Sequence, residues 1–364
     1  MRPVVLLWEN FGPYHHDRLG AVAASGREAI GNQFAPVSAT YSWSATVDDA
    51  TVVTLLPKGR SRSPIRLARR IFRECRRIGP AHFFFCHYEQ PAVLMAAIAL
   101  RLCGSRVWTM GDSKFDDYPR LLWREVGKSL YLLPYRGAIT ASSRSRDYLR
   151  FLRFKPQHLA LGYDTISVAR LRAQADAPPA PDGVGFWERE WIMVARLVPK
   201  KNIAFALEIF ARWLGETAHP RDLHILGSGP LEDELRALAA SLGISERVRF
   251  HGFVQTREVS RQLARSLALL MPSVEEQFGL AVIEAQAAGL PVLASPQVGA
   301  TDLLIDGGRN GFVLPLHSPA GWAASMLLLS EDEPTWRRFA AAARDGAHRG
   351  DTARFAEAVA QLTT

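Results

Sequence analysis

Short apolar segments alternate with longer amphipathic ones along most of this chain. The alternation runs twice, and a stretch rich in Ala, Pro and Gly separates the two rounds. This rhythm indicates parallel strands connected by helices that cover both faces of a sheet. At 364 residues the chain is also too long for one ordinary core. The sequence therefore predicts an α/β protein of two doubly wound, Rossmann-like domains that face each other across a ligand cleft.

The expected elements follow the apolar runs. In the first round, strands are expected at 4–8, 52–56, 82–86, 106–110 and 138–141, and helices at 16–24, 64–77, 91–103, 120–132 and 145–151. In the second round, strands are expected at 191–194, 222–226, 248–251, 268–271 and 291–294, and helices at 202–213, 231–242, 256–266 and around residue 284. We assign 1–172 to the first domain, 173–186 to a linker, 187–344 to the second domain, and 345–364 to a helix that packs back on the first.

The chain carries a net charge of +8, and much of the excess lies at 58–77. Such a surface could attract nucleic acid, anionic lipid or a phosphate-bearing substrate. The segment has apolar residues at helical spacing with arginines between them, namely Ile65, Ala68, Ile71, Phe72 and Cys75. It is either an ordinary packed helix with a basic outer face or a helix that docks on an anionic membrane surface. No helix-turn-helix, RNA-recognition or zinc-finger pattern supports a nucleic-acid partner.

Three features bear on the compartment of the protein. Its cysteines, Cys75, Cys86 and Cys103, show no metal-ligand spacing. The longest apolar run, near 92–100, is too short to cross a bilayer. The start of the chain lacks the apolar region and cleavage site of a signal peptide. We expect a reduced, cytoplasmic protein, with peripheral attachment to the inner face of the cell membrane left open.

A pair of glutamates, Glu276 and Glu284, is the most informative local feature. Glu284 lies inside an apolar, Ala-rich helical run, where an ionised carboxylate is costly unless it is paired. It could accept hydrogen bonds from two adjacent hydroxyls, as a ribose presents, or lie on a partly wet helix edge. Glu276 comes just before the expected helix start, where the amides of Phe278, Gly279 and Leu280 could bind an anion or a sugar. The pair indicates a pocket for a diphosphate joined to polyhydroxy groups.

Three other segments of the second half follow expected strands. Arg196 and Lys201 lie in one loop and could bind phosphate oxygens, although a solvated loop would look the same. Gly227 and Gly229 would let the backbone approach a ligand, or simply form a turn before a helix. The segment 250–254 could face a nucleobase with its backbone, or be an ordinary core strand.

These four segments, in this order, resemble retaining glycosyltransferases of the GT-B fold, of the group 1 type (glycosyltransferase family 4), over about 191–313. The resemblance implies that Arg196 and Lys201 neutralise the diphosphate of a nucleotide-sugar donor. It implies that Glu284 holds the ribose and Glu276 the transferred sugar. It also implies no cofactor and no metal, and we find no Asp-x-Asp motif. The full set of implied donor-binding residues is Gly12, Gly227, Gly229, Phe253, Val254, Phe278, Gly279, Leu280 and Glu284.

The first half resembles the family less closely. His87 ends an expected strand where the family often has a histidine near the reaction centre, so the resemblance makes it a catalytic candidate, with Glu89 beside it. Gly12 stands alone where a double glycine is common, and His16 and Arg18 follow it as acceptor-side candidates. Asp112 either binds acceptor hydroxyls or stabilises a turn.

The implied activity is transfer of a sugar, with retention, from a nucleotide-diphosphate sugar to a hydroxyl acceptor. The basic character favours a lipid-linked saccharide, a lipopolysaccharide or exopolysaccharide precursor, or a glycolipid as acceptor. A sugar-nucleotide epimerase or a glycosyl phosphorylase of the same fold would use a similar pocket. A basic nucleic-acid-binding protein is a further alternative, which predicts steeply salt-dependent binding.

Overall fold

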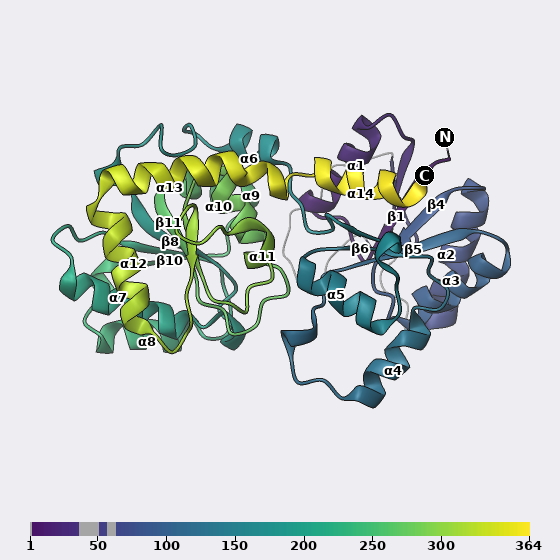
Figure 1. Ribbon diagram of the computed structural model, residues 1–364, viewed down its shortest axis with the longest axis horizontal. Coiled ribbons are helices and arrows are strands. Elements are labelled where there is room, and N and C mark those ends of the chain that lie inside the picture. The colour runs from purple at the N-terminus through teal and green to yellow at the C-terminus, as the bar shows by residue number, and fades with distance from the viewer. Residues whose placement is uncertain (1, 36–50, 57–62) are drawn as a thin grey trace. The chain divides into compact units, whose positions relative to one another are not determined.

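A computed structural model describes residues 2–35, 51–56 and 63–364. The chain divides into two compact units, Met1–Ser167 with Thr352–Thr364, and Val168–Asp351. Each unit contains one parallel sheet with helices packed around it (Figure 1). The predicted α/β class and the two doubly wound sheets are therefore confirmed.

The first sheet has the strand order β3-β2-β1-β4-β5-β6-β7. Its strands are β1 (Val4–Trp8), β2 (Ala29–Gln33), β3 (Val52–Thr54), β4 (His82–Phe85), β5 (Arg106–Gly111), β6 (Ala138–Thr140) and β7 (Leu159–Leu161). All adjacent strands pair in parallel. Strands β2 and β3 are added on one side of β1, and β4 is then added on the opposite side of β1. The switch point of this sheet therefore lies between β1 and β4.

The helices of the first unit are α1 (Pro13–Ala24), α2 (Pro64–Ile78), α3 (Pro91–Leu102), α4 (Leu122–Tyr131), α5 (Ser143–Leu152) and α14 (Ala353–Thr363). Proline at the first position of α1, α2 and α3 suits a helix start, because its missing N–H would have no partner there. Helix α14 packs against α1, and Thr363 Oγ1 accepts a hydrogen bond from Arg27 Nη1 at 2.6 Å.

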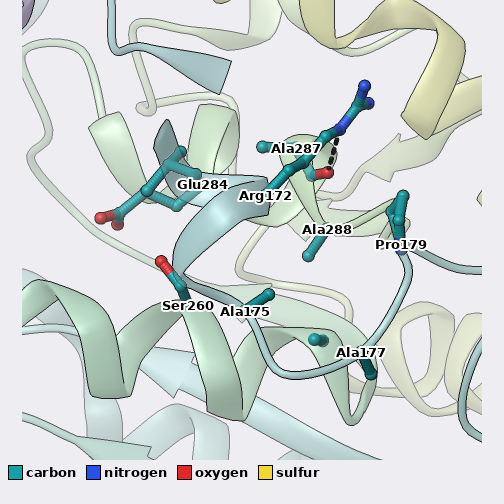
Figure 2. Close-up of a pocket in the computed structure, with 10 residues that line it drawn as sticks. Arg172, Ala175, Ala177, Pro179, Ser260, Glu284, Ala287 and Ala288 are labelled. Atoms are coloured by element: carbon teal, nitrogen blue, oxygen red, sulfur yellow. Dashed lines mark hydrogen bonds between the residues drawn. The ribbon is translucent and has the colours of Figure 1, made fainter. Parts of the chain in front are cut away.

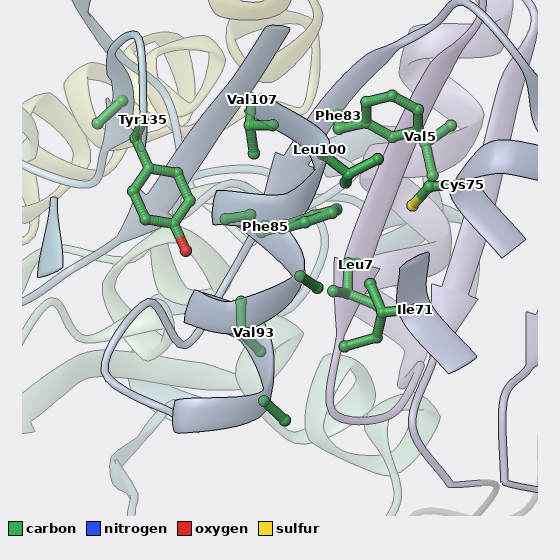
Figure 3. Packing of buried hydrophobic residues seen from close by; sticks show 14 of the residues in the cluster. Val5, Leu7, Ile71, Cys75, Phe83, Phe85, Val93, Leu100, Val107 and Tyr135 are labelled. Carbon is green, nitrogen blue, oxygen red and sulfur yellow. The ribbon is translucent and has the colours of Figure 1, made fainter. Parts of the chain in front are cut away.

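The core of the first unit shows what the basic helix α2 does. Its apolar side, with Ile71 and Cys75, packs on alternate strand residues such as Leu7 and Phe83 (Figure 3). Burial raises the pKa of the Cys75 thiol, so this cysteine is inert. The arginines of α2 are consequently left on its outer face, which is the arrangement of an ordinary packed helix. Residues 58–62 of the basic segment lie outside the described residues.

The second sheet has the order β10-β9-β8-β11-β12-β13 and is also parallel throughout. Its strands are β8 (Glu190–Val194), β9 (Leu223–Leu226), β10 (Val248–Gly252), β11 (Ser266–Met271), β12 (Val292–Ala294) and β13 (Gly311–Val313). Its helices are α6 (Val168–Gln174), α7 (Ile203–Glu216), α8 (Glu232–Ser241), α9 (Thr256–Ala264), α10 (Leu280–Ala287), α11 (Thr301–Leu304), α12 (Pro319–Glu331) and α13 (Glu333–Gly346). Here the switch point lies between β8 and β11.

The stretch expected to be a linker, 173–186, is placed differently by the structure, because it lies within the second unit. Ala180 is fully buried there, and its N–H donates to the Ala288 carbonyl at 2.8 Å. The buried Arg189 guanidinium donates to the carbonyls of Asp182 and Val184. These hydrogen bonds tie the Pro-rich stretch to the second unit. In the described part of the chain, no helix is long and apolar enough to span a bilayer.

Candidate functional site

The loops after β8 and β11 meet at the switch point of the second sheet. The Val274 N–H donates to the Lys200 carbonyl at 2.9 Å, and Lys200 Nζ lies 3.2 Å from Glu275 Oε1. Next to this pair, the Lys201 ammonium makes an ion pair with the Glu276 carboxylate. Parallel strands on either side of a switch point leave a crevice at their carboxyl ends, where ligands bind in this class of sheet. The topology thus brings together two predicted site residues from distant parts of the sequence.

Lys201 and Glu276 are both mostly buried. Lys201 ends a short 3-10 turn, Pro199–Lys201, and Asn202 then adopts a left-handed conformation (φ 53°) that directs the chain into α7. An ammonium group can donate up to three hydrogen bonds, so pairing with Glu276 leaves Lys201 capacity for a phosphate oxygen. Arg196 is exposed in the same loop, and its carbonyl accepts from the Val198 N–H at 2.9 Å.

The two glycines after β9 are required by loop packing. Gly227 has φ +144°, and a Cβ there would lie 1.9 Å from the Ala195 carbonyl oxygen. A Cβ on Gly229 would lie 2.4 Å from the Leu197 carbonyl oxygen. The Leu197 N–H donates to the Ser228 carbonyl at 3.0 Å. The glycines therefore let this loop lie directly against the Arg196 loop, which accounts for them without a ligand.

The start of α10 is fixed by another glycine and by the loop after β12. Gly279 has φ +103° and ends the Glu276 loop where the helix begins. The N–H groups of Gly299 and Ala300 donate to the carbonyls of Glu276 and Phe278, at 3.1 and 2.8 Å. The Phe278 side chain is buried, so this residue can offer a ligand its backbone but not its ring. The Val282 N–H already donates to the Gly279 carbonyl at 3.0 Å, so of the first-turn amides only those before it are left for an anion, and anion binding there stays a prediction.

Glu284 is buried in α10, where every residue from Ala281 to Ala287 is buried. A cavity of about 10 Å³ lies between α6, α9 and α10 and is lined by Glu284, Ser260 and Arg172 among others (Figure 2). The Arg172 guanidinium is turned away from Glu284 and donates to the Ala287 carbonyl at 2.9 Å. A cavity of this volume holds about one water molecule, so it is not the place for a nucleoside. Glu284 is nonetheless a buried acidic residue inside an apolar helix, as the sequence predicted.

The end of β10 offers an exposed ring. Phe253 is exposed and Val254 is half-buried, just before the start of α9 at Thr256. The segment is therefore not an ordinary core strand beyond Gly252. On the strand itself, His251 stacks on His224 of β9 with Nε2 and Nδ1 3.1 Å apart, a pair that no sequence pattern pointed to.

In the first unit, the predicted residues of the β1 and β4 loops lie at that sheet's switch point. Gly12 precedes α1, and its N–H donates to His15 Nδ1 at 3.0 Å. His16 lies against Phe11, with ring centroids 5.3 Å apart. His87 has a left-handed backbone (φ 60°), which is unusual for a non-glycine residue and common at functional sites.

The surroundings of His87 favour its cationic form. The adjacent Cys86 raises the pKa of His87, and so does Glu89, whose Oε1 lies 3.8 Å from His87 Nδ1. Burial opposes the ionisation of Glu89, but the interactions with His87, with its own backbone and with Lys128 together lower the pKa of Glu89. The end of β4 therefore presents an imidazole and a carboxylate close to each other.

Arg18 does not lie where an acceptor-binding residue is expected. It is buried, donates from Nη2 to Asp164 Oδ1 at 3.1 Å and from Nε to the Thr165 carbonyl at 3.2 Å, and stacks on the Tyr163 ring. Its guanidinium ties α1 to the segment after β7, so its position is structural. Sequence reasoning missed Asp164 because the two partners are far apart in the chain.

Asp112 is half-buried just after β5. Burial and the neighbouring Asp164 carboxylate raise the pKa of Asp112 to about 7, so it exchanges its proton near neutrality. Its role on the acceptor side stays a prediction. Among the described residues, no three His, Cys, Asp or Glu side chains converge as a metal site would require.

The family model for glycosyl transferases group 1 matches residues 188–346. The chain is 32% identical over 244 residues to a D-inositol 3-phosphate glycosyltransferase of Streptomyces bingchenggensis. The aligned region covers 64% of this chain and 53% of that protein. The chain spans about half the length, or less, of curated relatives that it matches.

Solved structures resemble the whole chain. One is a lipopolysaccharide outer core galactosyltransferase, with a TM-score of 0.73 and 15% identity over 99% of this chain and 98% of that one. Another is HepE of Anabaena in complex with UDP and glucose, with a TM-score of 0.70 and 17% identity over 99% of each chain. Residues 188–346 therefore match the group 1 glycosyltransferases, and the chain has the GT-B fold of these solved structures.

Proposed function

We propose that this protein transfers a sugar from a nucleotide-diphosphate sugar to a hydroxyl acceptor, with retention of anomeric configuration. One observation carries the proposal. At the switch point of the second sheet, Lys201 contacts Glu276 directly before the start of α10, and the buried Glu284 follows on the same helix. A cation, two carboxylates and a helix N-terminus are thus supplied by two segments, the loop after β8 and the segment that leads into α10. A diphosphate flanked by a ribose and a sugar needs these groups.

The proposed reaction proceeds on one face of the donor sugar. The acceptor oxygen forms a bond to the anomeric carbon as the bond to the diphosphate breaks, and the departing phosphate oxygen takes the acceptor proton. Arg196, Lys201 and the amides at the start of α10 stabilise the negative charge that develops on the leaving group. We propose that these protein groups neutralise the diphosphate without a bound metal. On the acceptor side, His87 and Asp112 are proposed to hold the hydroxyl.

The comparisons support this substrate class. HepE was crystallised with UDP and glucose, and another structural relative is a lipopolysaccharide galactosyltransferase. The acceptor is proposed to be a lipid-linked saccharide, a lipopolysaccharide or exopolysaccharide precursor, or a glycolipid. An epimerase would interconvert the free sugar nucleotide, and a phosphorylase would require inorganic phosphate in place of a nucleotide.

Binding of nucleoside diphosphates tests the role of Glu284. The protein is titrated calorimetrically with UDP, GDP and ADP, and then with the 2′,3′-dideoxy form of the one that binds best. Wild type should prefer the ribose form, and Glu284→Gln should lose about 10- to 100-fold in affinity for it, because a charge-assisted bond becomes a neutral one. The variant should bind the dideoxy form about as well as wild type does. Glu234→Gln, on the exposed first turn of α8, is the matched control.

Two outcomes would contradict the proposal. If no nucleoside diphosphate binds wild type, the donor assignment fails. If Glu284→Gln loses equal affinity for the ribose and dideoxy forms, Glu284 does not hold the ribose. Retention is checked separately, by the anomeric configuration of the transfer product in an NMR spectrum.

A further inference from the structure

Helix α4 of the first unit turns its apolar face outward. Leu122, Val126 and Leu130 are spaced four residues apart and form one stripe, with Trp123 beside it. Their exposed fractions are 70%, 59% and 60%, and that of Trp123 is 69%. The helix lies at the outer edge of the unit, away from the sheet (Figure 1). Surface helices normally direct such a stripe to the core, so α4 is inverted relative to the usual arrangement.

A buried polar network holds α4 in this orientation. Glu125, on the inward face, is buried and accepts a hydrogen bond from the Tyr148 hydroxyl of α5. Lys128 Nζ lies 3.3 Å from Glu125 Oε1 and 3.1 Å from the Tyr148 hydroxyl, to which Arg120 Nη1 also donates at 2.9 Å. Rotating the helix to bury its leucines would strip the Glu125 carboxylate of these partners, which is strongly unfavourable. The outward apolar face is therefore fixed by the fold.

The segment of the chain that carries this face is basic. Residues 115–153 contain eight Lys or Arg and four Asp or Glu, a net charge of +4 (8 − 4). Two of the four acids, Asp117 and Glu125, are buried in ion pairs together with one of the eight bases, Arg120. The other two acids lie at the surface, each paired with an arginine. The Arg124 guanidinium lies 5.1 Å from the centroid of the Trp123 ring. Exposed Leu and Trp flanked by arginines are the pattern of a helix that lies in the interface of an anionic membrane.

We propose that α4 docks on an anionic lipid bilayer, with Leu122, Trp123, Val126 and Leu130 at the acyl boundary and the flanking arginines at the headgroups. A second copy of the chain fits this face less well. In a symmetric dimer the same patch meets itself, so the positive charges around it would repel. Helix α2 is basic too, but its apolar side is in the core, so it can add only electrostatic attraction.

Vesicle flotation tests the docking. Vesicles of equal parts phosphatidylglycerol and phosphatidylcholine are compared with vesicles of phosphatidylcholine alone. Wild type should float with the anionic vesicles. Leu122→Glu/Leu130→Glu should lower the partition coefficient at least about tenfold, because two apolar contacts become charges of the lipid's own sign. The matched control is Leu102→Glu, since Leu102 is an 84% exposed leucine at the end of α3 in the same unit.

Three results would overturn the proposal. The first is that the double variant partitions into anionic vesicles as well as wild type does, while its circular dichroism spectrum and unfolding midpoint show that it is folded. Another is a lipid-free dimer by light scattering that the double variant dissociates, which would assign the face to a second copy. The third is loss of binding in Arg69→Glu/Arg73→Glu on α2 but not in the α4 variant. Nucleoside diphosphate binding, measured on the same proteins, is expected to be unchanged, so failure here is separable from failure of the proposed activity.

Discussion

Replacing Gly279 with alanine probes the junction on which the donor loop depends. The residue has φ +103° and ψ 72°, outside the region that side-chain-bearing residues enter easily. An added Cβ would lie 2.8 Å from Met271 Cε and 3.2 Å from Val298 Cγ1. Backbone strain of this kind costs about 1–3 kcal/mol. Overpacking adds about 1–3 kcal/mol, of which the flexible end of Met271 relieves a part.

We therefore expect Gly279→Ala to lower the free energy of unfolding of the second unit by about 2–5 kcal/mol. Urea denaturation followed by tryptophan fluorescence measures this change. Gly215→Ala is the control, because Gly215 lies in α7 with nothing within 4 Å of its added Cβ. Alanine there should be neutral or stabilise by up to about 1 kcal/mol. The reasoning is refuted if both variants unfold within about 0.5 kcal/mol of wild type, the range of an ordinary surface change.

Two further predictions address the charged groups of the two units. Lys201→Met should reduce the transfer rate about a hundredfold or more, as loss of one leaving-group donor does. The control Lys200→Met should keep a transfer rate within a few-fold of wild type, because the Lys200–Glu275 pair is more exposed. Equal losses of rate in the two variants, measured in a steady-state assay, would contradict the assignment. The pKa of Asp112 is raised from 3.8 to about 7, so the folded state binds more protons than the unfolded state between these values. Stability should therefore fall as pH rises through that window, and Asp112→Asn should remove the fall. The midpoints of urea unfolding at pH 5 and pH 8 test this, with Asp147→Asn, at an exposed residue, as the control. If stability falls between the two pH values as much in Asp112→Asn as in wild type, the explanation is wrong.

The parallel sheets could be predicted because their central strands are buried on both faces and read as apolar runs. β1 is placed at the predicted residues, and β4, β8 and β11 lie within two residues of prediction. β2 was missed because its sequence, AIGNQ, is half polar although it pairs with β1 along its length. The sequence also placed Lys201 and Glu276 in one site, but their ion pair is seen only in the structure, where the strand order brings the loops after β8 and β11 together.

What the sequence could not predict depends on partners distant in the chain. Arg18 follows a predicted loop and looks like a surface residue, and only the fold reveals that Asp164 and Tyr163 bury it. The helical spacing of α4 predicts a helix but not which side faces the protein. Tyr148, on the next helix, decides that by binding Glu125. Periodicity fixes the type of an element, whereas long-range polar contacts fix its orientation.

Glu284 and α4 break local rules in opposite ways. One is a carboxylate inside an apolar helix, and the other is an apolar stripe held outside by a buried carboxylate. A fold retains such features against their cost mostly where function requires them. Because they belong to different units, their effects should separate in experiment. Variants of α4 should change lipid partition without changing nucleotide affinity, and Glu284→Gln should do the reverse. A variant of either group that moved both measurements would mean that the two units are coupled more tightly than these two sites require.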